Sequence, residues 1–232
     1  MAGLITHMVV IREILKLLPE NTIQDVGLFY LGSLAPDAVH QREGYVRAFK
    51  KHTHFRDDIP DRDFELPENY KVYQRRLIDF INDNINRGDN LLDLYRGYVV
   101  HILADELFLT TVRKEFCDTM KEKGIDQNDH FFFEYIVTDM MRNDSLLTER
   151  YEDIDEIRSY LEQVKVQAVE SYISEKELEG SLKWLLQYYF YLGHEKQQPV
   201  YISYQRTLEF IHTAASEITK RLSDNDSLPK MF

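Results

Sequence analysis

The sequence is poor in the residues that make tight turns and cross-links. It has nine glycines and six prolines in 232 residues, and a single cysteine, Cys117. So few glycines and prolines argue against a protein of many short strands and favour long helices joined by short loops. A lone cysteine excludes an intramolecular disulfide and gives no sign of an oxidising compartment. We therefore expect an all-α protein.

Several functional signatures are also missing. No stretch approaches the roughly 18 apolar residues that a membrane span needs. Residues 1–19 carry charged side chains and no small-residue cleavage site, which does not fit a secretory signal. No glycine-rich phosphate loop, Gly-x-Ser-x-Gly elbow, paired CxxC or His-Asp dipeptide occurs. We expect a cytoplasmic protein without a transmembrane segment, and not a nucleotide hydrolase, a serine hydrolase or a zinc finger.

Basic residues are outnumbered, with 28 lysines and arginines against 40 acidic residues and a net charge of −12. Such a chain repels nucleic-acid phosphates, so we expect no stable nucleic-acid binding. The pattern of Arg47, Lys50 and Lys51 is typical of a solvated helix face. With 44% hydrophobic residues, the composition is that of a folded chain rather than a disordered one.

Apolar residues recur at helical spacing along most of the chain. The pattern predicts helices at 8–18, 23–34, 44–51, 70–86, 91–123, 129–142, 154–172, 175–192 and 201–222. Gly32 and Pro36 are expected to break the second helix, Gly124 to end the fifth, and an irregular loop to fill 56–68. We expect one multi-helix domain over residues 1–222 and a flexible tail at 223–232.

Two of these helices each carry a histidine and a carboxylate four residues apart. The pairs are His101/Asp105 and His130/Glu134, and the residues between their members are mostly apolar. This spacing places both side chains of a pair on one helix face, which is how helices present metal ligands. A carboxylate buried there needs a cation, a hydrogen-bond network or a proton. Each pair alone also fits a core histidine hydrogen-bonded to its neighbour.

An ordered series of motifs over residues 1–140 resembles the bacterial zinc-dependent phospholipase C family. The motifs are Thr6-His7, Gly32-Ser33-Leu34-Ala35-Pro36-Asp37, Lys51-His52-Thr53-His54-Phe55 and Gly97-Tyr98-Val99-Val100-His101 with Asp105. The resemblance implies the all-α fold that this family shares with the P1-type nucleases. It also implies hydrolysis of a phosphodiester or phosphomonoester, in a small molecule or a lipid head group.

The resemblance further implies a site of one to three zinc ions. Its ligands fall on His7, Asp37, His54, His101, Asp105, His130 and Glu134. Asp37 or Asp105 is then the general base or a bridging ligand. His52 competes with His54 for one position, and we favour His54 because it directly precedes Phe55.

The sequence departs from the family pattern in two places. The family usually has another histidine shortly after the aspartate that matches Asp105, but residues 106–111 contain none; Glu106 or Asp139 are possible replacements. The secreted phospholipases use their free amino terminus as a ligand, whereas six residues precede His7 here. The alternative to an enzyme is therefore a catalytically degenerate, metal-binding or scaffold protein of the same fold, and a plain helical bundle is a third reading.

Overall fold

The computed structural model describes residues 2–86, 90–193, 196–224 and 228–232, with only the backbone of His130. Its long helices are α1 (Leu4–Leu17), α2 (Val26–Ala38), α3 (Arg47–Thr53), α4 (Pro67–Ile85), α5 (Leu92–Thr110), α6 (Val112–Glu122), α7 (His130–Arg150), α8 (Ile154–Gln163), α9 (Glu175–Leu185) and α10 (Tyr204–Ser223). Short 3₁₀ helices form η1 (Val39–Gln41) and η2 (Asp61–Asp63), and a π-helix, η3 (Leu186–Tyr191), continues α9. In the described residues, one isolated β-bridge joins Val169 to Ile173. The all-α prediction is confirmed.

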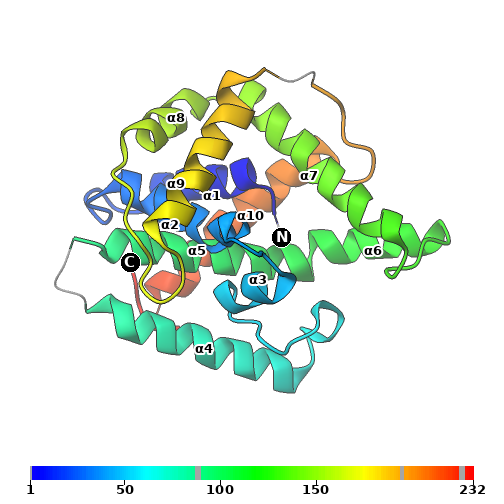
Figure 1. The fold of residues 1–232 in the computed structure, drawn as a ribbon, viewed down its shortest axis with the longest axis horizontal. Helices are drawn as coiled ribbons and strands as arrows, with labels where there is room; N and C mark the ends of the chain where they lie inside the picture. The colour runs from blue at the N-terminus through cyan, green and yellow to red at the C-terminus, as the bar shows by residue number, and fades with distance from the viewer. Residues whose placement is uncertain (1, 87–89, 194–195, 225–227) are drawn as a thin grey trace.

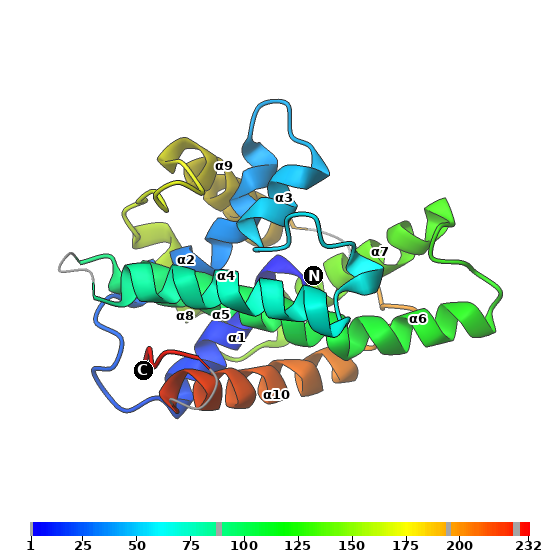
Figure 2. The ribbon, with the colours of Figure 1, turned by 90° about the horizontal axis from the view of Figure 1, so that it is seen from below.

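Helices α2 and α5 form the centre of the molecule. Figure 1 shows them crossing its middle, with α4 on one side and α8 and α9 on the other. In the perpendicular view, α10 lies on one side of α5 and α3 on the other (Figure 2). The two central helices pack backbone to backbone, because a side chain at Gly32 would overlap the Leu94 carbonyl and one at Gly97 would overlap the Phe29 carbonyl. The functional motifs of α2 and α5 therefore lie in the deepest part of the fold.

Helix α1 is fixed by a buried carboxylate of α7. Asp144 accepts hydrogen bonds from the backbone N–H groups of Ile5 (3.1 Å) and Thr6 (2.9 Å) and from the Thr6 hydroxyl (2.8 Å). These groups belong to the first turn of α1, whose N–H groups have no partner within the helix. The contact fixes the position of His7, the next residue along the helix.

Several predicted helix boundaries were wrong. Helix α2 continues through Gly32 and Pro36 to Ala38, because burial on both sides stabilises it beyond the propensity of those residues. The predicted helix at 91–123 is two helices separated at Thr111, where the hydroxyls of Thr110 and Thr111 donate to backbone carbonyls one turn earlier. Such bonds compete with the backbone hydrogen bonds of the helix and bend the helix.

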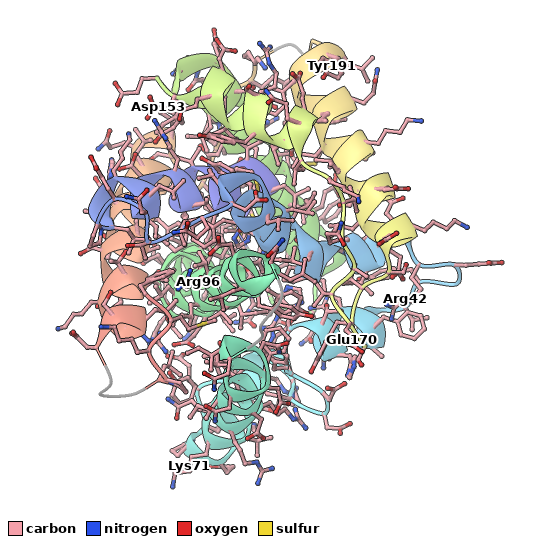
Figure 3. All side chains as sticks on the ribbon, turned by 90° about the vertical axis from the view of Figure 1, so that its left-hand side faces the viewer. Arg42, Lys71, Arg96, Asp153, Glu170 and Tyr191 are labelled. Atoms are coloured by element: carbon pink, nitrogen blue, oxygen red, sulfur yellow. The ribbon has the colours of Figure 1, made fainter. Side chains whose placement is uncertain are left out.

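The later helices differ from the prediction in length. Helix α7 extends to Arg150, and α8 ends at Gln163, after which the chain is extended up to the bridge between Val169 and Ile173. The predicted cap at Gly124 is confirmed by its positive φ of 74°. Helix α9 is tied to the segment after α2 by Arg42, which donates to Glu177 and to the Tyr172 carbonyl (Figure 3).

The described end of the expected tail packs onto the helices instead of fraying. Leu228 and Met231 are buried, and the Met231 carbonyl accepts a hydrogen bond of 2.7 Å from Nε of Arg96 on α5. Figure 3 labels Arg96 near the middle of the molecule. Among the residues that the structure describes, no helix has the length and apolar character needed to cross a membrane.

Candidate metal centre

Five of the seven ligands expected from the sequence come together in the core. Helix α1 supplies His7, α2 supplies Asp37, the residue after α3 is His54, and α5 supplies His101 and Asp105. Each of these side chains is buried, with at most 8% of its residue surface exposed. Such a set of histidines and carboxylates, removed from water, needs a compensating cation or a dense network of hydrogen bonds.

The ligand atoms of this cluster are within a few ångströms of one another. His54 Nε2 lies 3.2 Å from His101 Nε2, 3.3 Å from Asp105 Oδ2 and 3.4 Å from Asp37 Oδ1. His7 Nε2 lies 3.3 Å from Asp105 Oδ1, and the rings of His7 and His101 stack at 3.8 Å. The backbone N–H of Ala2 also donates to Asp105 Oδ1, over 2.9 Å.

Backbone carbonyls fix which nitrogen of two imidazoles carries the proton. The Nδ1 of His101 lies 2.7 Å from the Ser33 carbonyl, and the Nδ1 of His54 lies 2.9 Å from the Lys50 carbonyl. A carbonyl only accepts hydrogen bonds, so each Nδ1 carries a hydrogen and, in the neutral ring, each Nε2 carries a lone pair. The two lone pairs then point into the same small volume. This orientation of imidazoles by outer carbonyl groups is typical of metal-ligating histidines.

Burial and neighbouring charges set the protonation states in the cluster. Burial lowers the pKa of His101 well below its ordinary value, and the nearby His7 lowers it further. Burial alone would raise the pKa of Asp37, but the charge of Lys50 holds it well below its ordinary value. At neutral pH, His101 is therefore neutral and Asp37 ionised, the forms in which both residues bind metals.

Lys50 is a member of this site that the sequence did not indicate. It was expected on a solvated helix face, but it is buried and its Nζ forms an ion pair with Asp37 Oδ1. The signal that could have found it is its spacing. Lys50 lies four residues before His54, one helical turn away and on the same side of α3.

The structure separates His54 from its competitor. His52 is exposed and its Nδ1 lies 3.1 Å from Asp57 Oδ2, whereas His54 lies inside the cluster. Glu134 is not brought to the cluster, because it is exposed on the first turns of α7. The side chain of His130 lies outside the described part of the chain.

The two possible replacements for the missing histidine have other partners. The Glu106 carboxylate accepts hydrogen bonds from the hydroxyls of Tyr70 and Tyr73 and from Arg221, and so connects α5 to α4 and α10. The Asp139 carboxylate accepts bonds from three successive backbone N–H groups, at residues 200, 201 and 202. Both carboxylates hold helices and loops in place and are not in the cluster.

Among the described residues, two overlapping sets of side chains could hold a metal ion. One is His7, His101 and Asp105, and the other is Asp37, His54 and His101; within each set the ligand atoms lie within 4.8 Å of one another. Both sets use His101, whose Nδ1 is occupied by the Ser33 carbonyl. Its Nε2 has a single lone pair and serves one ion.

Protein-family models, curated proteins and solved structures gave no match to this chain. The resemblance to phospholipase C therefore rests on the sequence motifs alone. The convergence of His7, Asp37, His54, His101 and Asp105 is independent of that resemblance, because it is seen in distances, burial and hydrogen bonds within the chain.

Proposed function

We propose that the protein is a metal-dependent hydrolase of phosphoric esters, with zinc in the centre formed by His7, Asp37, His54, His101 and Asp105. The observation that carries this proposal is the pair of Nε2 atoms of His54 and His101, 3.2 Å apart and both oriented by backbone carbonyls. Two lone pairs at that distance repel each other unless a cation or a proton lies between them. Burial disfavours a proton on His101, and two imidazole nitrogens that converge beside carboxylates form a donor set that suits a cation such as zinc.

The donor set fits zinc better than the other common cations. Zinc prefers imidazole nitrogen and carboxylate oxygen together, whereas calcium and magnesium prefer oxygen alone. When bound, the ion would act as a Lewis acid on a phosphoryl oxygen and would lower the pKa of a water molecule. Because His101 serves only one ion and Lys50 already compensates Asp37, we propose a single zinc ion rather than two or three.

The two carboxylates have different surroundings and therefore different proposed roles. Asp105 has its oxygens within 3.3 to 4.0 Å of the Nε2 atoms of His7, His54 and His101, as a metal ligand would. Asp37 lies at the edge of the cluster, beside Lys50. We assign Asp105 as ligand and Asp37 as the general base, whose Oδ atom would accept the proton of the attacking water.

A second candidate is a protein that binds zinc without catalysis. The ion pair of Lys50 with Asp37 favours it, since a paired carboxylate is a weaker base. The exposed position of Glu134 also favours it, because a carboxylate that the resemblance assigns to a metal then lies outside the cluster. The two candidates share the metal and differ in turnover.

The zinc content of purified protein tests both candidates. Elemental analysis of the wild type and of His52→Ala is expected to give about one zinc per chain, and His54→Ala is expected to give none. His52 is a matched control, because it lies in the same segment but outside the cluster. Metal-free wild type with unchanged thermal stability in a chelator would contradict both candidates.

Turnover separates the enzyme from the binding protein. Hydrolysis of p-nitrophenyl phosphate and of bis(p-nitrophenyl) phosphate is expected for the wild type and for His52→Ala, and not for His54→Ala or for chelator-treated protein. Zinc at full occupancy with hydrolysis no faster than that of free zinc would leave only the binding protein.

A further inference from the structure

A pocket with a volume of about 440 Å³ lies beside the metal centre. Its walls come from α3 and the segment that follows it, from the junction of α5 and α6, and from the first turns of α7. Lys50 lines this pocket and also contacts Asp37 of the metal centre. A smaller pocket lined by His54 and Asp105 shares Arg56 and Leu109 with it. A molecule in the larger pocket would therefore lie next to Lys50, which contacts the metal centre through Asp37.

The walls of this pocket are strongly basic. They include six cationic side chains, Arg47, Lys50, Lys51, Arg56, Arg62 and Arg113, and, among the described lining residues, Asp61 as the one carboxylate. The chain as a whole carries a net charge of −12. Cations gathered in one concave region of an acidic protein create a local field that attracts anions.

Neighbouring groups hold several of these cations in place. Arg47 and Arg56 both pair with Asp61, and Lys51 Nζ donates to the Ile59 carbonyl over 3.1 Å. Arg56 is only 13% exposed. Burial alone would raise the pKa of Asp61, but the charges of the surrounding arginines outweigh burial and lower that pKa below its ordinary value. Side chains that are already positioned lose little entropy when they bind a ligand.

The wall on α7 is apolar. It consists of Phe132, Phe133, Ile136 and Met140, and the Arg47 guanidinium lies 5.8 Å from the centre of the Phe133 ring. The pocket volume is in the range of roughly 300–1,000 Å³ that is usual for small-molecule sites. The pocket thus suits a small molecule with several negative charges and an apolar part.

We infer that this pocket binds a small phosphate ester with at least one further phosphate group, and that this polyanion is the substrate class of the metal centre. One arginine can bind a phosphate group through two parallel hydrogen bonds, and this pocket offers four arginines and two lysines, more cations than one phosphate group can pair with. A zwitterionic head group such as phosphorylcholine would bring a quaternary ammonium against these cations and be repelled. The assignment as substrate rests on the proposed hydrolase function; the binding of the anion does not.

Calorimetric titration of metal-free protein tests the binding. Tripolyphosphate is expected to bind, with an affinity that falls as salt is added, and phosphorylcholine at least about tenfold more weakly. Arg56→Gln is expected to weaken tripolyphosphate about tenfold. Arg62→Gln provides a second variant, since Arg62 is 78% exposed and its loss does not threaten folding. Arg158→Gln, the same change on α8, is the control and should bind like the wild type.

The outcomes separate this inference from the proposed function. Equal affinity for both ligands, or wild-type binding by both Arg56→Gln and Arg62→Gln, would overturn the inference even if zinc and hydrolysis are present. Tripolyphosphate binding by His54→Ala, after that variant has lost its zinc, would support an anion pocket formed by the protein itself. Wild type that carries no zinc when it is purified, but still binds tripolyphosphate, would uphold the pocket and reject the hydrolase.

Discussion

Two helices of this protein carry the same spacing of histidine and carboxylate, but among the described side chains only the pair on α5 lies in a cluster of ligands. On α5, Asp105 lies within 3.3 Å of His7 and of His54, and His101 is fully buried. On α7, Glu134 points to solvent. The spacing puts two side chains on one helix face. Whether that face becomes a site depends on what packs against it.

The difference comes from the neighbours of each helix. Helix α5 crosses α2 at such close range that Gly32 and Gly97 leave no room for a Cβ atom. That crossing brings the Ser33 carbonyl to His101 and places Asp37 within reach of His54. Helix α7 instead buries carboxylates farther along, such as Asp144, which caps α1. Its first turns lie at the rim of the basic pocket.

The largest expected effect comes from opening the crossing of α2 and α5. Gly32→Ala should lower the free energy of unfolding by more than about 3 kcal/mol, because the added methyl group overlaps the Leu94 carbonyl and the backbone must shift. The same shift should move the Ser33 carbonyl away from Nδ1 of His101 and abolish zinc binding. Urea unfolding and elemental analysis of the purified variant measure the two effects.

Gly180→Ala on α9 is the matched control for this change. The nearest group to a methyl there is the end of the flexible Gln41 side chain, so the variant should be neutral or more stable by up to about 1 kcal/mol. Equal stability of Gly32→Ala and Gly180→Ala would show that the close crossing does not shape the site.

A smaller effect is expected from removing the cation beside Asp37. Lys50→Met leaves the Asp37 carboxylate buried without its partner. In metal-free protein this should lower the free energy of unfolding by about 3 kcal/mol. Added zinc should recover part of this loss, because the ion supplies a positive charge at the same carboxylate. Thermal unfolding with zinc and with a chelator measures both values.

Lys71→Met serves as the control for the loss of a lysine, since Lys71 is exposed on α4 (Figure 3). It should change stability by less than about 0.5 kcal/mol in either condition. If zinc does not reduce the loss of unfolding free energy in Lys50→Met, then Asp37 is not near the ion. The contrast between α5 and α7 would then rest on Asp105 alone.

The sequence was sufficient to predict the helical class, because helix periodicity is a local property. Within the cluster, the spacing on one helix face indicated His101 and Asp105, whereas His7, Asp37 and His54 came from the resemblance to phospholipase C. The sequence was not sufficient for features that depend on residues far apart along the chain. Gly32 looks like a helix breaker in isolation, and its role in the crossing becomes visible only with α5 beside it. Lys50 and Arg56 look like solvated surface residues until the chain folds over them. The same limit applies to Glu134, whose exposure depends on how α7 packs.

The smallest expected effect is the one that tests the comparison most directly. Glu134→Gln should leave zinc content unchanged and alter the free energy of unfolding by less than about 0.5 kcal/mol, because an exposed carboxylate loses little when its charge is removed. Asp105→Asn, the same loss of charge at the equivalent position of the other pair, should release the zinc.

Parallel measurement of zinc content and hydrolysis in Glu134→Gln and Asp105→Asn makes the comparison quantitative. If Glu134→Gln loses zinc or hydrolysis to the same extent as Asp105→Asn, then α7 must turn its first turns toward the metal centre when substrate or metal binds. The two pairs would then be equivalent, and the spacing alone would have been sufficient to find the site. A wild-type result for Glu134→Gln with a metal-free Asp105→Asn shows instead that burial by a neighbouring helix is the deciding condition.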